Sequence, residues 1–208
     1  MREDKKALWE DYTSSRFKGR GSHSHFPNWF KRIEGPLLDV GCGIGEFLNV
    51  NQSEFKIGLE ISWWALQEAK RKFGLEHLVR ASGTQLPFKE EAFKSVVLIE
   101  VIEHVKDLDS LLQEARRVLK RGGKLFIKTP NYPFKRLYDI KRRSIQSGKF
   151  VIPPDDPTHF NPLSLRKLVK HLRKYFEVLW VDPYEIFFER HVPRTCLLYT
   201  SPSPRDRG

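Results

Sequence analysis

The feature that most constrains the fold of this chain is a glycine-rich turn directly after a short apolar run. Residues 36–48 read PLLDVGCGIGEFL, with glycines at positions 41, 43 and 45. The apolar run predicts a buried strand, and the residues after the turn predict the start of a helix. Glycine lets the backbone turn sharply and approach a ligand closely. This strand–turn–helix unit is typical of α/β proteins, whose ligands bind beyond the carboxyl ends of parallel strands.

The rest of the chain continues to alternate between strand and helix patterns. Ser62 can cap one helix, and Asp107 or Asp109 can cap another. We predict strands at 36–40, 55–61, 77–81, 95–100, 124–128 and 177–182, and helices at 46–50, 63–73, 108–119 and 162–175. The predicted fold class is α/β: a doubly wound, Rossmann-like, mostly parallel sheet with helices on both faces.

Composition excludes several other classes of protein. The 208 residues suffice for one domain of ordinary size, and no stretch approaches the ~18 apolar residues of a membrane helix. The N-terminal residues lead into no apolar signal segment. The two cysteines, Cys42 and Cys196, form no Cys-x-x-Cys pair, so neither a disulfide scaffold nor a structural zinc site is expected. We therefore expect a cytoplasmic location.

The net charge of +11 is concentrated in one half of the chain. Residues 1–104 carry 15 Lys/Arg and 15 Asp/Glu, whereas residues 105–208 carry 22 and 11. Most of the excess lies in residues 131–150, where aromatic residues are interleaved with it, and in residues 164–175. This pattern fits either a basic face that meets an anionic partner or a solvated charged surface.

Two carboxylates near the ends of consecutive predicted strands indicate the ligand. Asp39 stands just before the glycines, and Glu60 lies 21 residues later, where a carboxylate can accept protons from two ribose hydroxyls. A dinucleotide fingerprint requires glycine at position 46, which is Glu here and would repel a pyrophosphate. An adenosyl ligand without phosphates fits these acids better. The simpler alternative is ordinary capping at the strand ends.

Five segments in this order resemble class I S-adenosylmethionine-dependent methyltransferases. The run LLDVGCGIGEFL resembles motif I, and IGLEIS resembles the second motif. The stretches LPFKEEAFKSVVLIEVIEHV and EARRVLKRGGKLFIKTPN resemble the segments around the fourth and fifth strands. DPTHFNPLSLRKLV resembles the branch related to ubiquinone-biosynthesis O-methyltransferases. The resemblance covers roughly residues 35–182 and implies S-adenosyl-L-methionine as the cofactor.

The resemblance implies roles for individual residues. The turn around the amino-acid end and ribose of the cofactor would comprise Asp39, Gly41, Cys42, Gly43 and Gly45, with Cys42 a small buried filler rather than a nucleophile. Glu60 would bind the ribose hydroxyls, and Ile61 would pack on the adenine. Many relatives carry Asp where this chain has Ser82, which leaves adenine recognition to Ser82 Oγ and the Gly83 backbone. Glu100 would lie near the methionine moiety.

Two histidines are candidates for a catalytic base. A base is needed only where the methyl acceptor carries a proton, as a phenol or an alcohol does. His104 follows the fourth predicted strand, with Glu103 to orient it, and His159 lies in DPTHFNP on the expected substrate side. Either histidine could instead stabilise its loop. We predict no metal, because the spacing of His23, His25, His104 and His159 is unlike that of metal ligands.

The domain organisation follows from these segments. We predict an N-terminal helical lid at 1–34 and a methyltransferase domain at 35–194, with a basic insertion at 131–160. Residues 195–208, TCLLYTSPSPRDRG, resemble the translated adapter tail seen on unrelated proteins from environmental DNA. We expect this tail to be non-native and outside the fold, with the natural C-terminus missing. Residues 186–193 are short for the antiparallel last strand of such sheets, so that strand is expected to be truncated.

The predicted function is methyl transfer to oxygen or nitrogen of a small-molecule acceptor, anionic acceptors included. Alternative acceptors are RNA, read by stacking and phosphate contacts, and a lipid-linked molecule reached by peripheral contact with a membrane. Nucleic acid is not favoured, because no N/D-P-P-Y motif follows the fourth strand. A protein that binds the cofactor without catalysis is a further alternative.

Overall fold

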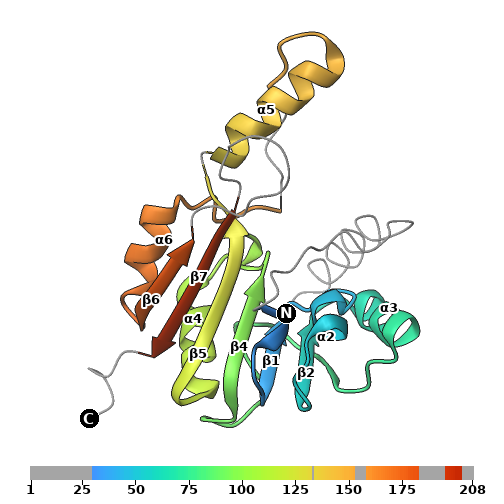
Figure 1. Cartoon of the computed structure of the whole chain (residues 1–208), viewed down its shortest axis with the longest axis vertical. Coiled ribbons are helices and arrows are strands. Elements are labelled where there is room, and N and C mark those ends of the chain that lie inside the picture. Colours follow the sequence, from blue (N-terminus) through green and yellow to red (C-terminus); the bar gives the residue numbers. More distant parts are fainter. Residues whose placement is uncertain (1–29, 133, 153–157, 183–194, 203–208) are drawn as a thin grey trace.

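The computed structural model describes residues 30–132, 134–152, 158–182 and 195–202. Seven strands form one sheet in the order β3-β2-β1-β4-β5-β7-β6 (Figure 1). The five parallel strands are β1 (Leu37–Val40), β2 (Lys56–Glu60), β3 (Leu78–Arg80), β4 (Phe93–Ile99) and β5 (Leu119–Pro130). β7 (Thr195–Pro202) lies antiparallel between β5 and β6 (Phe176–Asp182). The α/β class and the mostly parallel sheet are thus confirmed.

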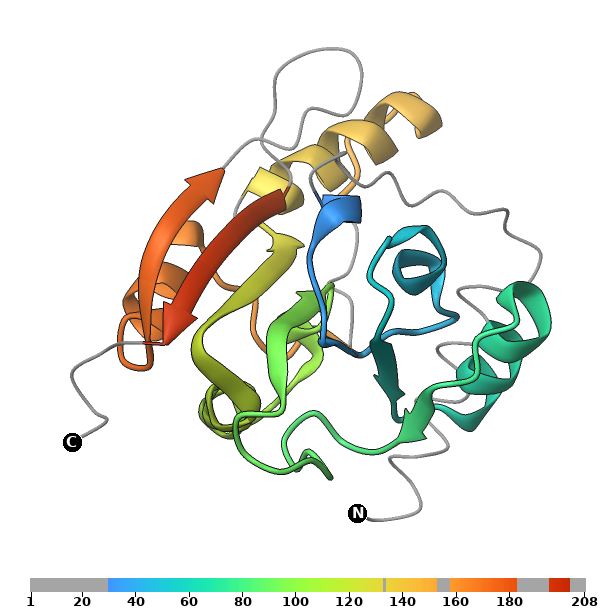
Figure 2. The ribbon, with the colours of Figure 1, turned by 60° about the horizontal axis from the view of Figure 1, so that its bottom comes forward.

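The helices begin close to their predicted caps. They are α2 (Glu46–Val50), α3 (Trp63–Phe73), α4 (Leu108–Val118), α5 (Phe134–Ser147) and α6 (Leu165–Leu172), with 3-10 turns η1 (Phe30–Arg32) and η2 (Ile102–His104). Ser62 Oγ accepts the Ala65 amide at 3.2 Å, and Asp107 Oδ1 accepts the Ser110 amide at 3.0 Å. α3 lies beside β2 and β3 at one edge of the sheet, and α6 lies beside β6 at the other (Figure 2).

Both faces of the sheet are covered, as a parallel sheet requires. Successive side chains of a strand point to opposite faces. Leu38 and Val40 of β1 join a core with α4 and α6, whereas Leu37 joins a second core with η1, α2 and α3. β4 divides its residues in the same way, because Val96 and Val97 belong to different cores. These two cores hold the strand ends of the candidate site in place.

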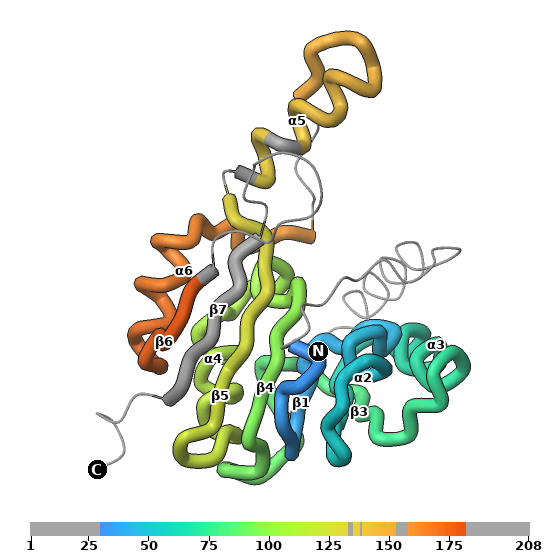
Figure 3. The backbone as a smooth tube through the Cα atoms, in the orientation of Figure 1, coloured from blue at the N-terminus to red at the C-terminus, as the bar shows by residue number. Residues whose placement is uncertain are grey.

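Two parts of the chain differ from the prediction. The helix predicted at 108–119 ends at Val118, and the strand predicted at 124–128 begins earlier, at Leu119. Pairing with β4 jumps from Leu119 opposite Phe93 to Lys124 opposite Ser95, so residues 120–123 form an irregularity in which Gly122 has φ +70°. The second difference is α5, which occupies 14 residues of the insertion at 131–160 and extends beyond the carboxyl end of β5 (Figures 1 and 3). Lys135 and Asp139 form an i,i+4 ion pair within it at 2.5 Å.

The last strand differs from the sequence expectation. Residues 195–208 were expected outside the fold, yet Thr195–Pro202 form β7, paired with β5 from Pro130 opposite Thr195 to Leu125 opposite Thr200. Strand pairing satisfies backbone groups, so a segment without alternating side chains can still fill a gap between two strand edges. The non-native origin of residues 195–208 stays a prediction. Of the lid predicted at 1–34, residues 1–29 lie outside the described residues, as does the stretch 186–193, whereas Phe30 and Ile33 are buried in the second core.

None of the described helices combines the length and the apolar character that crossing a membrane requires.

Candidate functional site

The glycine turn after β1 has the geometry that a close ligand approach needs. Gly41, Gly43 and Gly45 all have positive φ, at +74°, +53° and +81°. The amides of Gly41 and Cys42 both donate to the Leu59 carbonyl, at 2.7 and 3.0 Å, which fixes the turn against the end of β2. A Cβ on Gly41 would lie 2.5 Å from Val101 Cγ2. The turn therefore needs glycine both for its backbone conformation and for its packing.

Gly45→Ala tests how tightly this turn is specified. A Cβ at Gly45 would lie 2.3 Å from Leu75 Cδ1 and 3.2 Å from Ala69 Cβ. Gly74, which ends α3, is the matched control, because it has φ +64° but nothing within 4 Å of an added Cβ. We expect Gly74→Ala to lower the free energy of unfolding by about 1 kcal/mol, from backbone strain alone. Gly45→Ala should lose about 1–3 kcal/mol more from overpacking.

Urea unfolding of both variants measures this difference. An equal decrease in the free energy of unfolding for the two variants would contradict the packing of the turn against α3. Backbone strain alone would then explain both decreases.

Glu60 lies at the end of β2 and holds the glycine turn through its carboxylate. Glu60 Oε2 accepts the Gly43 amide at 3.1 Å, and Oε1 accepts the amides of Ile61 and Ser62 at 2.7 and 2.9 Å. The side chain is buried, with 7% of its surface exposed. The sequence analysis assigned Glu60 to the ribose hydroxyls and did not anticipate this contact with the turn. One carboxylate can perform both tasks, since its two oxygens offer about four acceptor positions.

Asp39 is a buried acid of the glycine turn with an oxygen left unsatisfied within the described part of the chain. Its side chain is 1% exposed, and Oδ1 has no hydrogen-bond partner among the described residues. Burial, followed by the nearby charge of Glu60, raises the pKa of Asp39 to about 8. A buried acceptor without a donor costs free energy. A ligand that brings a hydrogen-bond donor or a positive charge to this turn would remove that cost, so the residues fit a cofactor with a cationic amino-acid end.

Cys42 lies beside these acids but is poorly suited to act as a nucleophile. The side chain is buried, and burial together with the charges of Asp39 and Glu60 raises the pKa of the thiol well above its usual value. Only a thiolate is an effective nucleophile. The sulfur fills space near β2 instead, because a Cβ on Gly58 would lie 2.8 Å from it. The geometry agrees with the expectation of a buried filler.

The residues expected around the adenine lie after β2 and β3. Ile61 is half-buried, and its carbonyl accepts Arg80 Nε at 3.1 Å. Ser82 Oγ makes a hydrogen bond of 2.8 Å with Thr84 Oγ1 and accepts the Thr84 amide. Gly83 packs closely on the core, since a Cβ there would lie 2.8 Å from Val40 Cγ1. Ser82 thus already bonds within its own turn, which makes its role toward adenine a prediction still to be tested.

The carboxyl end of β4 carries a strained residue and the histidine cluster. Glu100 has φ +55°, an uncommon conformation for a side chain of this kind, and its amide donates to the Lys128 carbonyl at 2.7 Å. Immediately after it, η2 places His104 in the interior, where Nδ1 lies 3.0 Å from the Thr158 carbonyl oxygen. Backbone strain of this kind gathers at functional sites.

The fold brings the two candidate bases together. The rings of His104 and His159 have centroids 4.7 Å apart, although the residues are 55 positions apart in the chain. His159 Nδ1 makes a hydrogen bond of 2.5 Å with Tyr132 Oη, and Glu103 Oε2 accepts Thr129 Oγ1 at 3.0 Å. Sequence reasoning missed Thr129, Tyr132 and Thr158. No local motif marks them, because each acts through a contact that only the tertiary fold creates.

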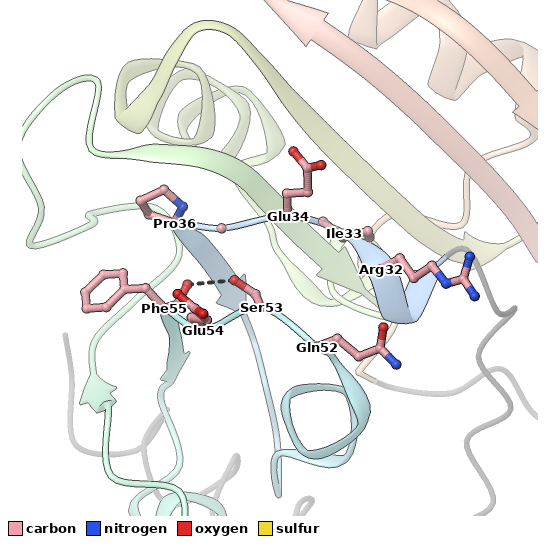
Figure 4. A pocket seen from close by; sticks show the side chains of 9 residues that line it. Arg32, Ile33, Glu34, Pro36, Gln52, Ser53, Glu54 and Phe55 are labelled. Atoms are coloured by element: carbon pink, nitrogen blue, oxygen red, sulfur yellow. Dashed lines mark hydrogen bonds between the residues drawn. The ribbon is translucent and has the colours of Figure 1, made fainter.

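A separate hollow lies at the amino ends of β1 and β2. It is formed by residues that precede β1 and β2, among them Glu34, Ser53 and Phe55, and Ser53 Oγ donates to the Phe55 carbonyl at 3.1 Å (Figure 4). None of the described site residues lines it. Because ligands of parallel sheets bind at the carboxyl ends of the strands, the glycine turn and not this hollow is the candidate site.

Fold and site together define a class of protein: a doubly wound α/β domain whose glycine turn carries the buried acids Asp39 and Glu60. Residues 38–127 match the family described as "Methyltransferase domain". The matched residues include the glycine turn, Asp39, Glu60 and Glu100, so this part of the chain is similar to S-adenosylmethionine-dependent methyltransferase domains, a similarity that implies S-adenosyl-L-methionine as the cofactor.

Three relatives show how far the similarity extends along the chain. The chain is 41% identical over 95 residues to protein MJ0638 of Methanocaldococcus jannaschii, covering 46% of this chain and 40% of that one. It is 27% identical over 191 residues to a demethylmenaquinone methyltransferase of Bacteroides fragilis, covering 84% and 78%. It is 36% identical over 94 residues to the tRNA (carboxymethyluridine(34)-5-O)-methyltransferase of Arabidopsis thaliana, covering 44% and 23%.

A solved structure agrees on the fold. A SAM-dependent methyltransferase from Methanosarcina mazei superposes with a TM-score of 0.62 at 19% identity, covering 85% of this chain and 97% of that one. Among the curated relatives, the chain spans less than half the length of MJ0638 and less than a quarter of the Arabidopsis protein.

Proposed function

We propose that this chain transfers the methyl group of S-adenosylmethionine to an oxygen or nitrogen atom of a small-molecule acceptor. The observation that carries the proposal is that an acidic glycine turn and a histidine cluster follow neighbouring strands, β1 and β4, at their carboxyl ends. Asp39 and Glu60 belong to the turn, and His104 and His159 form the cluster. Paired imidazoles suit proton transfer from an acceptor, which a protein that only bound the cofactor would not need.

The predicted site residues would contact different parts of the cofactor. Glu60 would accept the ribose hydroxyls, and Asp39 would face the cationic amino-acid end. Ile61, Ser82 and Gly83 would border the adenine, and Glu100 would lie beside the methionine portion. When bound, the cofactor supplies an electrophilic methyl group on a good leaving group. The protein then contributes mainly proximity and in-line alignment of the acceptor.

The histidine cluster can accept the proton that the methyl acceptor loses. A carbonyl oxygen only accepts hydrogen bonds, so the Thr158 carbonyl indicates a proton on Nδ1 of His104. The lone pair then resides on Nε2, where it can take a proton from a hydroxyl or an ammonium acceptor. His159, through Tyr132, is positioned to act as the second base or to orient the first. This arrangement supports an O- or N-acceptor over one that carries no exchangeable proton.

Binding and turnover test the proposal separately. Calorimetric titration with S-adenosylmethionine should give micromolar affinity, and NAD should give none. Formation of S-adenosylhomocysteine should then be screened with phenols, hydroxy acids and amines, using His104→Gln as the inactive comparison and His77→Ala as the active control. Cofactor binding without turnover on any acceptor class would contradict the enzymatic function and favour a cofactor-binding protein. Absence of cofactor binding by the folded chain would contradict the site.

A second candidate acceptor is RNA, or a lipid-linked molecule, reached through α5. This helix carries Lys141, Arg142 and Arg143, and exposes the apolar side chains of Leu137 and Ile145. By their names, one relative acts on a tRNA and another on demethylmenaquinone. The same assay with bulk tRNA and with a short-chain quinol distinguishes these acceptors from free small molecules. Exclusive turnover on tRNA would replace the small-molecule proposal.

A further inference from the structure

The group formed by Glu103, His104 and His159 has the composition of a metal site. Each of the three residues offers one ligand atom, and these atoms all lie within 4.8 Å of one another. Ligands of a tetrahedral ion with bonds of ~2.1 Å lie ~3.4 Å apart, so small side-chain adjustments would bring the three atoms onto one ion. The members come from η2 and from the segment before α6, which explains why spacing along the chain gave no indication of the group.

Each member of the group is oriented by a second hydrogen bond. Thr129 Oγ1 donates to Glu103 Oε2 at 3.0 Å. The Thr158 carbonyl lies 3.0 Å from His104 Nδ1, and Tyr132 Oη lies 2.5 Å from His159 Nδ1. Metal-ligating histidines typically use one ring nitrogen for such a bond and the other for the metal, and ligating carboxylates are hydrogen-bonded in turn.

The backbone also holds the two halves of the group together. The amides of Phe160 and Asn161 both donate to the Glu103 carbonyl, at 2.7 and 3.0 Å. The Glu103 side chain itself is 1% exposed, and burial of a carboxylate is costly unless a cation or hydrogen bonds compensate it. The position is therefore held by backbone hydrogen bonds and is negatively charged when Glu103 is ionised, which are conditions that favour a bound cation.

We propose that Glu103, His104 and His159 bind one divalent transition-metal ion, of the class of Zn²⁺, at the acceptor side of the cofactor site. Two imidazoles and one carboxylate suit this class better than Mg²⁺, which prefers oxygen ligands. Three protein ligands leave open positions, as in catalytic rather than structural metal sites. With the ion bound, the lone pair of His104 Nε2 would bind the metal and would no longer act as a base; the ion would instead lower the pKa of an acceptor hydroxyl at an open position. That role rests on the proposed function, whereas metal binding itself does not.

Metal titration of the whole chain tests the site without any activity measurement. After dialysis against a chelator, Co²⁺ should give visible absorption bands of a nitrogen-ligated ion with a stoichiometry of one per chain, and Zn²⁺ should displace it. Glu103→Gln and His159→Ala should each weaken Zn²⁺ binding at least tenfold. Thr129→Val, which removes only the orienting hydrogen bond, should weaken it about tenfold. His77→Ala, which removes an exposed histidine elsewhere, should change nothing.

The same samples separate failure of this site from failure of the proposed function. Each variant should bind S-adenosylmethionine as the parent chain does, which also shows that it is folded. A parent chain that binds neither Co²⁺ nor Zn²⁺ overturns the site, and so does undiminished binding in both Glu103→Gln and His159→Ala. Metal binding that follows the prediction in a chain without cofactor affinity would support the metal site and reject the proposed function.

Discussion

Glu60→Gln should weaken binding of S-adenosylmethionine by about 100-fold. The variant keeps the shape of the side chain but replaces a charged acceptor with an amide. Hydrogen bonds to a charged group contribute about 1.5–3 kcal/mol each, and 1.4 kcal/mol corresponds to tenfold in affinity. Loss of charge toward two ribose hydroxyls therefore predicts an effect of this size. Calorimetric titration of both proteins measures it directly.

The same substitution should also disturb the turn itself. Oε1 of a glutamine can still accept the amides of Ile61 and Ser62, but its NH₂ group would face the Gly43 amide, donor against donor. We expect the free energy of unfolding to fall by about 1–3 kcal/mol, the cost of one unsatisfied buried group. Glu76→Gln is the matched control, because it removes the same charge from an exposed side chain nearby. Comparable affinity losses in both variants would show that net charge, and not Glu60, governs cofactor binding.

Much of the fold could be predicted because its determinants are local. The apolar runs of β1, β2 and β4, the caps Ser62 and Asp107, and the glycine turn all act within a few residues. β7 could not be predicted, because its position depends on the gap between β5 and β6 rather than on a pattern in residues 195–202. α5 was missed for a different reason: its charges and the flanking prolines suggest a loop, and only the helix reveals the Lys135–Asp139 pair.

The same distinction between local patterns and tertiary contacts applies to the candidate site. Asp39 and Glu60 stand near the ends of predicted strands, so the sequence could predict that both acids lie at the glycine turn, and their role toward the cofactor stays a prediction. The histidine cluster depends on a contact between η2 and residues 158–161, which local patterns do not encode. The sequence could therefore suggest His104 and His159 as separate candidate bases. It could not predict that their rings lie in contact, or that Thr129 and Tyr132 are hydrogen-bond partners of the cluster.

Asp39→Asn should remove a pH dependence of the free energy of unfolding that the parent chain shows. In the folded chain the pKa of Asp39 is raised to about 8 by burial and by Glu60, against an ordinary value of 3.8. An acid with a raised pKa stabilises the fold fully below pH ~4, and this contribution is lost as the pH rises toward 8. The asparagine variant does not ionise. Its stability relative to the parent chain should therefore increase between pH 4 and 8, by a few kcal/mol, as chemical unfolding across this range would show.

Cofactor binding should respond in the opposite sense, because the cationic end of the ligand requires the ionised form of Asp39. Below pH 8 the parent chain must release a proton on binding, so affinity should rise by up to tenfold per pH unit toward 8. Asp39→Asn should bind at least tenfold more weakly at pH 8 and show little of this slope. Calorimetry in two buffers of different ionisation enthalpy detects the released proton. An undiminished slope in the variant would assign the titration to another group and leave Asp39 a structural acid of the turn.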